Sequence, residues 1–254
     1  MTAKLRGRDL AASLALLLGL LGLWWLASHQ QWVSKVFLPT PDAALAALID
    51  GLRDGDLAAY TAATVRRMLL GWLLAAVLGI GLGALIGSSA AARAWLQPTL
   101  EFIRPLPASA LLPLAIAIFG LSPTMVMVVV AFGAMWPVLL ATLHGFASVH
   151  VRLQEVAQAL QLSRIAFAIK IGLPNAMTDI LAGMRLSLTV SLVVAVVGEM
   201  IASQPGLGQS ILLAARSFRA NELFAGVILL GAIGFASNAL LAAAEASLLR
   251  WQRP

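Results

Sequence analysis

Long apolar runs alternate with short polar segments along this chain. The runs cover residues 10–27, 68–88, 106–121, 124–143, 176–201 and 223–249. Each is long enough, or nearly so, to cross the hydrocarbon core of a membrane as a helix, and a backbone in lipid has to satisfy its own hydrogen bonds. The polar segments are too short to hold a soluble domain. The pattern predicts an all-α membrane protein with six transmembrane helices, forming one domain over residues 1–254.

The run 106–121 is the weakest of the six. It is short and carries Pro107 and Pro113, and proline inside a helix removes a backbone hydrogen bond. A re-entrant segment is the alternative, and it would move every later loop to the other side of the membrane.

The basic residues distinguish these two topologies. The chain is 61% hydrophobic and 11% charged with a formal net charge of +6, which in so apolar a chain indicates cytoplasmic loops rather than nucleic-acid binding. Six crossings place ten Lys and Arg inside and six outside, whereas a re-entrant third run gives seven against nine. The positive-inside rule favours six crossings, with both termini in the cytoplasm. The ten inside residues are Lys4, Arg6, Arg8, Arg93, Arg104, Arg152, Arg164, Lys170, Arg250 and Arg253.

The second run has a face of small residues. They recur every four positions, at Gly71, Ala75, Gly79, Gly83 and Gly87. Small side chains at this spacing let another helix approach closely. The face is predicted to pack against a neighbouring helix.

Enzyme chemistry finds little support in the sequence. His29, His144 and His150 are scattered without metal-ligand spacing, cysteine is absent, and none of the three lysines ends a nucleotide-binding loop. We expect no catalytic residue, metal ligand or cofactor in this chain. If ATP drives it, the ATP and Mg²⁺ are bound by a separate subunit.

The fifth run carries polar residues along one face. Ser187 and Ser191 are one turn apart, and Arg185 and Glu199 lie near the two ends of the run. One interpretation is that these four residues line a polar passage. The alternative for the serines is hydrogen bonding to their own helix. Arg185 either faces a wet cavity or extends back to the cytoplasmic surface.

The segment 150–174 is the most polar stretch between two runs. Its first part is amphipathic: Leu153, Val156, Ala157 and Leu160 form one stripe, opposite a stripe rich in glutamine. Ser163 is predicted to cap a second short helix, which Gly172 and Pro174 would end. A helix lying on the lipid surface is the alternative, but a glutamine-rich polar face suits a protein partner better than anionic lipid.

This segment resembles the cytoplasmic loop of ABC importer permeases. Their pattern is E-A-A, three residues, Gly, nine residues and I-x-L-P. At the positions of this pattern the chain has Glu155, Val156, Ala157, Gln161, Ile171, Gly172, Leu173 and Pro174, and Leu160 is expected to belong to the same coupling loop. Val156 and Gln161 depart from the pattern, and Gln161 replaces a glycine that would ease a tight turn.

Further stretches are similar to the branch of those permeases that imports aliphatic sulfonates, taurine and nitrate. They are FLPTPDAAL (37–45), IRPLPASALLPLAIAIFGLSP (103–123), GMRLSL (183–188) and GEMIASQPGLGQSI (198–211). The resemblance implies a type I importer permease in a bacterial inner membrane, working as a dimer. It also implies two cytoplasmic ATP-binding subunits on the Glu155 loop and a periplasmic solute-binding protein.

The solute is expected to be an organosulfonate, taurine or nitrate-like anion, with a pyrimidine precursor or an aromatic acid as the alternative. A channel or secondary transporter would need no ATPase. However, the runs show no clear inverted repeat, and the docking loop would be unexplained.

Overall fold

The structure, a computed structural model, describes residues 2–249 and is all-helical within them. The helices in chain order are α1 (Thr2–His29), α2 (Pro41–Arg53), α3 (Leu57–Gly87), α4 (Ala90–Ile103), the 3₁₀ helix η1 (Ala108–Leu111), α5 (Leu112–Phe119), α6 (Pro123–Ala147), α7 (Val151–Ala159), α8 (Arg164–Phe167), the π-helical turn η2 (Ala168–Gly172), α9 (Leu173–Ala202), α10 (Leu207–Arg216) and α11 (Ala220–Leu248). Arg250 and Arg253, two of the cations predicted to lie inside, are outside the described residues.

Five helical segments are long and apolar enough to cross a membrane. They are Ala12–His29, Leu57–Gly87, Pro123–Ala147, Arg164–Ala202 and Ala220–Leu248. They coincide with five of the six predicted runs. The prediction of an all-α membrane protein is therefore confirmed, although the second and fifth spans begin more than ten residues earlier than predicted.

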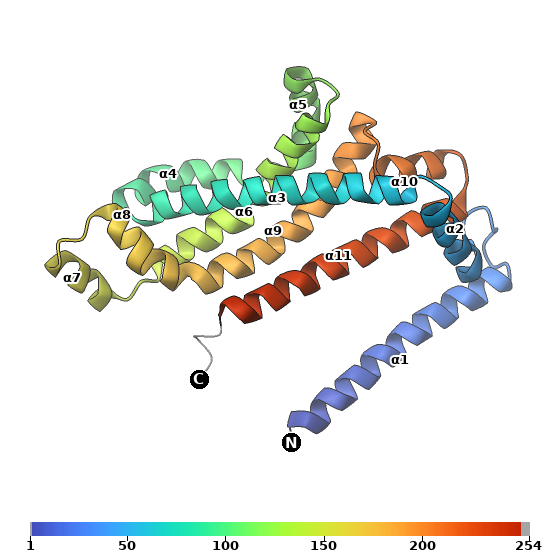
Figure 1. Cartoon of the computed structure of the whole chain (residues 1–254), viewed down its shortest axis with the longest axis horizontal. Helices are drawn as coiled ribbons and strands as arrows, with labels where there is room; N and C mark the ends of the chain where they lie inside the picture. Colours follow the sequence, from blue (N-terminus) through green and yellow to red (C-terminus); the bar gives the residue numbers. More distant parts are fainter. Residues whose placement is uncertain (1, 250–254) are drawn as a thin grey trace. The chain divides into compact units, whose positions relative to one another are not determined.

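The third predicted span is a broken helix. Residues 91–103 and 108–119 form two helical pieces that meet at an angle of 80°, and Figure 1 shows α5 turning away from α4. Pro105 and Pro107 lie at the break, where each removes a backbone N–H and disfavours helical geometry in the residue before it. The run predicted over 106–121 thus covers only the second piece. The first piece, α4, was not predicted as part of a span because its polar residues interrupt the apolar pattern.

The chain divides into two compact units. The first comprises Met1–Tyr60 and Ser210–Gly231, and the second comprises Thr61–Gln209 and Ala232–Pro254. A single membrane domain over residues 1–254 stays a prediction from the sequence.

The second unit is built around α6 and α9, which lie side by side (Figure 1). The small-residue face of α3 packs on α6, as predicted. A Cβ added to Gly79 would lie 2.9 Å from the carbonyl oxygen of Met135, and one on Gly83 would lie 2.8 Å from that of Leu139. Ala75, on the same face, is fully buried. Any larger side chain would push the two helices apart.

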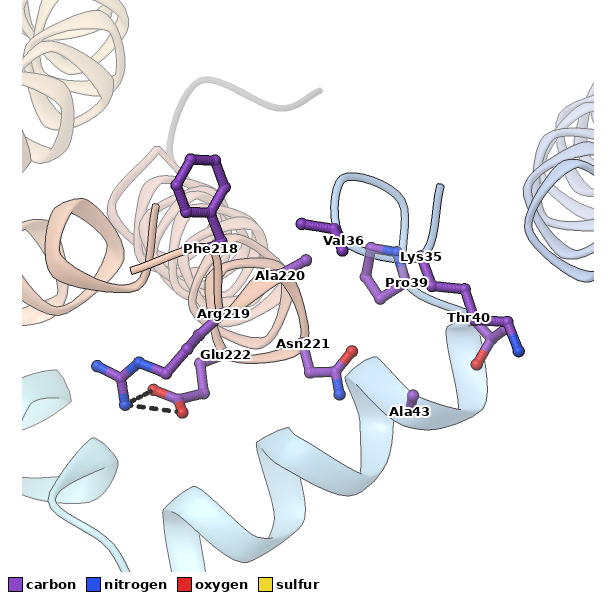
Figure 2. A pocket seen from close by; sticks show the side chains of 10 residues that line it. All are labelled: Lys35, Val36, Pro39, Thr40, Ala43, Phe218, Arg219, Ala220, Asn221 and Glu222. Atoms are coloured by element: carbon purple, nitrogen blue, oxygen red, sulfur yellow. Dashed lines mark hydrogen bonds and ion pairs between the residues drawn. The ribbon is translucent and has the colours of Figure 1, made fainter. Parts of the chain in front are cut away.

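The first unit is held together by aromatic contacts. Trp24 Nε1 donates a hydrogen bond of 2.9 Å to the Pro39 carbonyl, and its ring stacks on Phe224 with centroids 5.5 Å apart. The loops before α2 and α11 enclose a pocket of about 520 Å³ (Figure 2). An ion pair of 2.8 Å between Arg219 and Glu222 forms one of its walls.

Candidate functional site

The predicted docking segment contains a short exposed helix, α7. Its residue Ala157 is buried, whereas Leu153, Val156 and Leu160 are 44%, 50% and 67% exposed. Glu155 is exposed as well. The predicted apolar stripe therefore divides, because Ala157 holds the helix to its own chain and the three larger side chains face outward.

Gln161 ends α7 in the left-handed conformation, with φ of +49°. The Leu162 N–H donates to the Ala157 carbonyl at 3.0 Å, and the Gln161 N–H donates to the Gln158 carbonyl at 2.9 Å. This pair of bonds defines a Schellman ending, in which the left-handed position usually holds glycine. The tight turn expected at this position is present, although a glutamine occupies it.

Ser163 begins the next helix as predicted, since its Oγ accepts a 3.2 Å hydrogen bond from the Ala166 N–H. The predicted stop at Gly172 and Pro174 is wrong. The helix continues through the π-helical turn η2, where the Leu173 N–H donates to the Ala168 carbonyl five residues back. Pro174 lies in the first turn of α9, a position where its missing N–H is tolerated.

Gly172 serves helix packing rather than helix termination. Its φ of −63° is ordinary helical geometry, so no left-handed cap is formed. A Cβ at this position would collide with the ring of Phe146 on α6. The absent side chain lets α6 lie against the start of α9, and that contact carries the helix past the proline.

The start of α9, directly after the segment 150–174, is joined closely to the end of α6. The Asn175 side-chain amide donates to the Gly145 carbonyl at 2.9 Å and contacts Ser148 Oγ at 3.3 Å. A Cβ on Gly145 would meet Ala176, including its Cα at 2.6 Å. The segment 150–174 is therefore followed directly by a helix start that is fixed to the end of α6.

The two serines of α9 are inside a helix interface. Ser187 Oγ donates to the Ala134 carbonyl on α6 at 2.6 Å, and Ser191 Oγ donates to the Leu188 carbonyl of its own helix at 2.7 Å. Both residues are fully buried. Within the single chain this face packs between α6 and α9, and the Ser191 bond to its own helix is the one that the alternative interpretation expects. A passage role for the two serines stays a prediction.

Arg185 forms an ion pair with Glu245 on α11. Its side chain remains 46% exposed, and that of Glu245 is 23% exposed. From the sequence, Arg185 is expected to face a wet cavity or to extend back to the cytoplasmic surface. The structure instead supplies a counter-ion from a distant helix, which reduces the cost of a charge within a span. A pathway role for Arg185 stays a prediction.

Glu199 is the centre of a buried polar network at the other end of α9. Its carboxylate accepts from Arg67 Nη1 at 2.6 Å, Thr64 Oγ1 at 2.9 Å and the Gly208 N–H at 3.0 Å. The Thr64 hydroxyl in turn accepts from the Leu207 N–H at 2.9 Å. These bonds connect α3, the end of α9 and the beginning of α10 around one fully buried carboxylate.

The partners of Glu199 were not predicted from the sequence. Arg67 is one of the six basic residues expected outside, in a loop, because the apolar run begins at residue 68, but α3 already starts at Leu57. Thr64 and Arg67 are three positions apart, so they share a helix face. Gly206 and Gly208 belong to the site too, since a Cβ on either would collide with Glu199 or with the backbone of α9.

Within residues 2–249, the structure holds no group of three or more His, Asp or Glu placed to bind a metal ion. The polar sites described in this subsection include the ion pairs Arg185–Glu245 and Arg67–Glu199 and the exposed helical segment around α7. Their contacts serve packing, anchoring and charge compensation.

Comparisons with known proteins agree with this architecture. Residues 75–253 match the family described as the binding-protein-dependent transport system inner membrane component. The SsuC protein of Bacillus subtilis, whose name assigns it to aliphatic sulfonate transport, is 32% identical over 92% of this chain and 84% of its own length. The taurine transport system permease protein TauC of Escherichia coli is 31% identical, over 96% of this chain and 90% of TauC.

The nitrate import permease protein NrtB of Leptolyngbya laminosa is 32% identical over 71% of this chain and 64% of NrtB. The family match covers more than half of the chain, and two relatives above 30% identity cover nearly all of it. The chain therefore belongs to the family of binding-protein-dependent transport system inner membrane components, as a multi-pass permease subunit of an importer.

Proposed function

We propose that this permease imports a small organosulfonate, taurine or nitrate-like anion, and that residues 150–174 are the surface on which a cytoplasmic ATPase subunit docks. The substrate class rests on the names of SsuC, TauC and NrtB. The docking surface rests on one observation: α7 exposes Leu153, Val156 and Leu160 together.

The exposed apolar side chains of α7 suit a groove in a protein partner. A short amphipathic helix binds such a groove through apolar residues about one turn apart. Glu155 lies on the same helix, where a charge at the rim guides orientation more than it adds affinity. The polar side of α7 carries glutamines rather than lysines, which disfavours anionic lipid as the partner.

The proposed assembly contains two copies of this chain, two ATPase subunits and a periplasmic solute-binding protein. In this proposal the termini and α7 lie in the cytoplasm, which is the orientation that the positive-inside rule favours for the sequence. Docking then moves α7, and the contacts of Asn175 and Gly172 with α6 carry the motion into the spans.

A charge reversal on α7 tests the proposal. Glu155→Lys and Leu160→Asp should each reduce co-purification of the ATPase subunit by about tenfold, and binding-protein-dependent import should fall in parallel. Asp54→Lys is the matched control, since it makes the same charge change in an exposed loop that is predicted to lie on the opposite side of the membrane. If the ATPase subunit co-purifies at the wild-type level with both α7 variants, the docking proposal is wrong and α7 is instead a helix on the lipid surface.

A further inference from the structure

A cavity of about 530 Å³ lies in the second unit, beside the break between α4 and α5. Its volume is within the range of small-molecule sites. It is lined by the broken span, by α6 and by α9. Non-helical backbone at membrane depth is tolerated where it is buried in protein or lines a cavity, and the break at residues 104–107 has this position.

Trp136 lines the cavity and carries an unused hydrogen-bond donor. The residue is buried, and its Nε1–H has no acceptor among the residues that the structure describes. A buried donor without a partner costs free energy and needs an explanation. The Nε1 atom is itself buried, so a solute in the cavity reaches this donor only when the indole ring turns toward it.

Arg104 supplies a positive charge to the same cavity, and it is the only charged residue in the described lining. It has no ion-pair partner among the described residues, unlike Arg67, Arg185 and Arg219. Ser109, across the break, adds a hydroxyl. Both residues are exposed, so a solute can reach them.

The opposite wall of the cavity is apolar. Leu186, Val190, Val193 and Val197 form one stripe of α9. This stripe is adjacent to the serine face that packs on α6. The break itself is held near α6 at Gly133, where an added Cβ would lie 2.7 Å from the Cβ of Ala108.

We propose that this cavity is a binding site for the transported solute, and that it takes an organic sulfonate or a similar oxyanion. The oxyanion head binds the exposed Arg104 and Ser109, the Trp136 Nε1–H becomes a further donor when the indole ring turns, and the carbon chain lies against Leu186, Val190, Val193 and Val197 of α9. The inference deepens the proposed function and rests on it. The permease would then contribute to substrate selection itself.

The head group of an anionic phospholipid has the same chemistry. A sulfonate with a short chain fits the arrangement better, because the apolar wall lies within a cavity of small-molecule size. The experiment therefore separates the two sources by varying the lipid.

Direct binding measures the site. The full-length permease, purified with its ATPase subunit in phosphatidylcholine nanodiscs, is titrated with radiolabelled butanesulfonate in the absence of the binding protein. Arg104→Gln should weaken binding by tenfold or more, since it removes a charge-assisted contact. Trp136→Phe keeps the ring and removes only the N–H, and it should weaken binding about fivefold. Trp95→Phe, a change at an exposed tryptophan of α4, is the matched control and should have no effect.

Three results would overturn the site: no saturable binding by the wild-type protein, binding unchanged in both cavity variants, or displacement of butanesulfonate by phosphatidylglycerol added to the nanodiscs. The last result would assign the cavity to a lipid head group. Co-purification of the ATPase and ATP-driven import by the same wild-type preparation test the proposed function separately. Import that persists although the cavity does not bind butanesulfonate would contradict the proposed binding site but not the proposed function.

Discussion

The two ends of α9 are built on opposite principles. At the Leu173 end the helix is joined to α6 by close backbone packing at Gly145 and Gly172, and the adjoining α7 exposes three large apolar side chains. At the other end, Glu199 is fully buried and accepts three hydrogen bonds from its own chain. One end adjoins an exposed apolar surface, while the other satisfies its polar groups internally.

This difference shows where the helix can receive motion and where it is held. The contacts described for the Leu173 end are uncharged, consisting of the Asn175 amide bonds and the close packing at Gly145 and Gly172, so this end can shift against α6 at modest cost. Moving the Glu199 end would expose or unpair a buried carboxylate, which is expensive. We therefore expect the Glu199 network to act as the fixed end of α9, and the three predictions below test that contrast.

The largest effect is expected from breaking the buried ion pair. Arg67→Ala leaves the Glu199 carboxylate buried without its cation, and it should lower the free energy of unfolding by about 3–5 kcal/mol. Thermal unfolding in detergent measures the loss. Arg66→Ala is the matched control, because Arg66 is the neighbouring arginine and is exposed; we expect it to change stability little.

The double variant Arg67→Met with Glu199→Leu sharpens this test. Apolar residues of similar volume in place of both charges should recover most of the stability lost in Arg67→Ala. A double variant that is less stable than the single one would show that the hydrogen bonds from Thr64 and Gly208, rather than the charge pair, hold this end.

An intermediate effect is expected from overpacking the other end. Gly145→Ala places a methyl group against Ala176 and should cost about 1–3 kcal/mol of unfolding free energy, while reducing ATP-driven import because α9 is displaced. Gly81→Ala is the control, since a Cβ there meets nothing within 4 Å. Equal stability of the two variants would contradict the close contact between α6 and α9.

The smallest effect is expected at the turn after α7. Gln161→Gly removes the strain of a side chain in the left-handed region and should stabilise the turn by about 1 kcal/mol. Gln158→Gly, inside α7, should instead destabilise the helix by about the same amount. Hydrogen exchange at the Leu162 amide reports both, and slower exchange is expected only in the first variant. Faster exchange in Gln161→Gly would mean that the glutamine side chain itself supports the turn.

Local patterns in the sequence predicted what depends on neighbours along the chain. The four-residue spacing of small residues in α3 indicated a packing face, and Ser163 indicated a helix start. Glutamine at the glycine position of the permease pattern argued against a tight turn at Gln161, but the structure has one there. The packing face and the helix start are each decided within one or two helical turns, so they can be read without knowing the partner.

The sequence by itself determined the class of the protein: five long apolar spans, a proline-rich sixth, and an amphipathic segment between two of them. The tertiary structure decided which faces meet. It carried the helix past Pro174 through the Phe146 contact, paired Glu199 with an arginine 132 positions away, and directed the valine stripe of α9, rather than its serines, into the cavity. Periodicity shows that a face is small or apolar, but the helix that covers it comes from far along the chain, and only folding brings the two together.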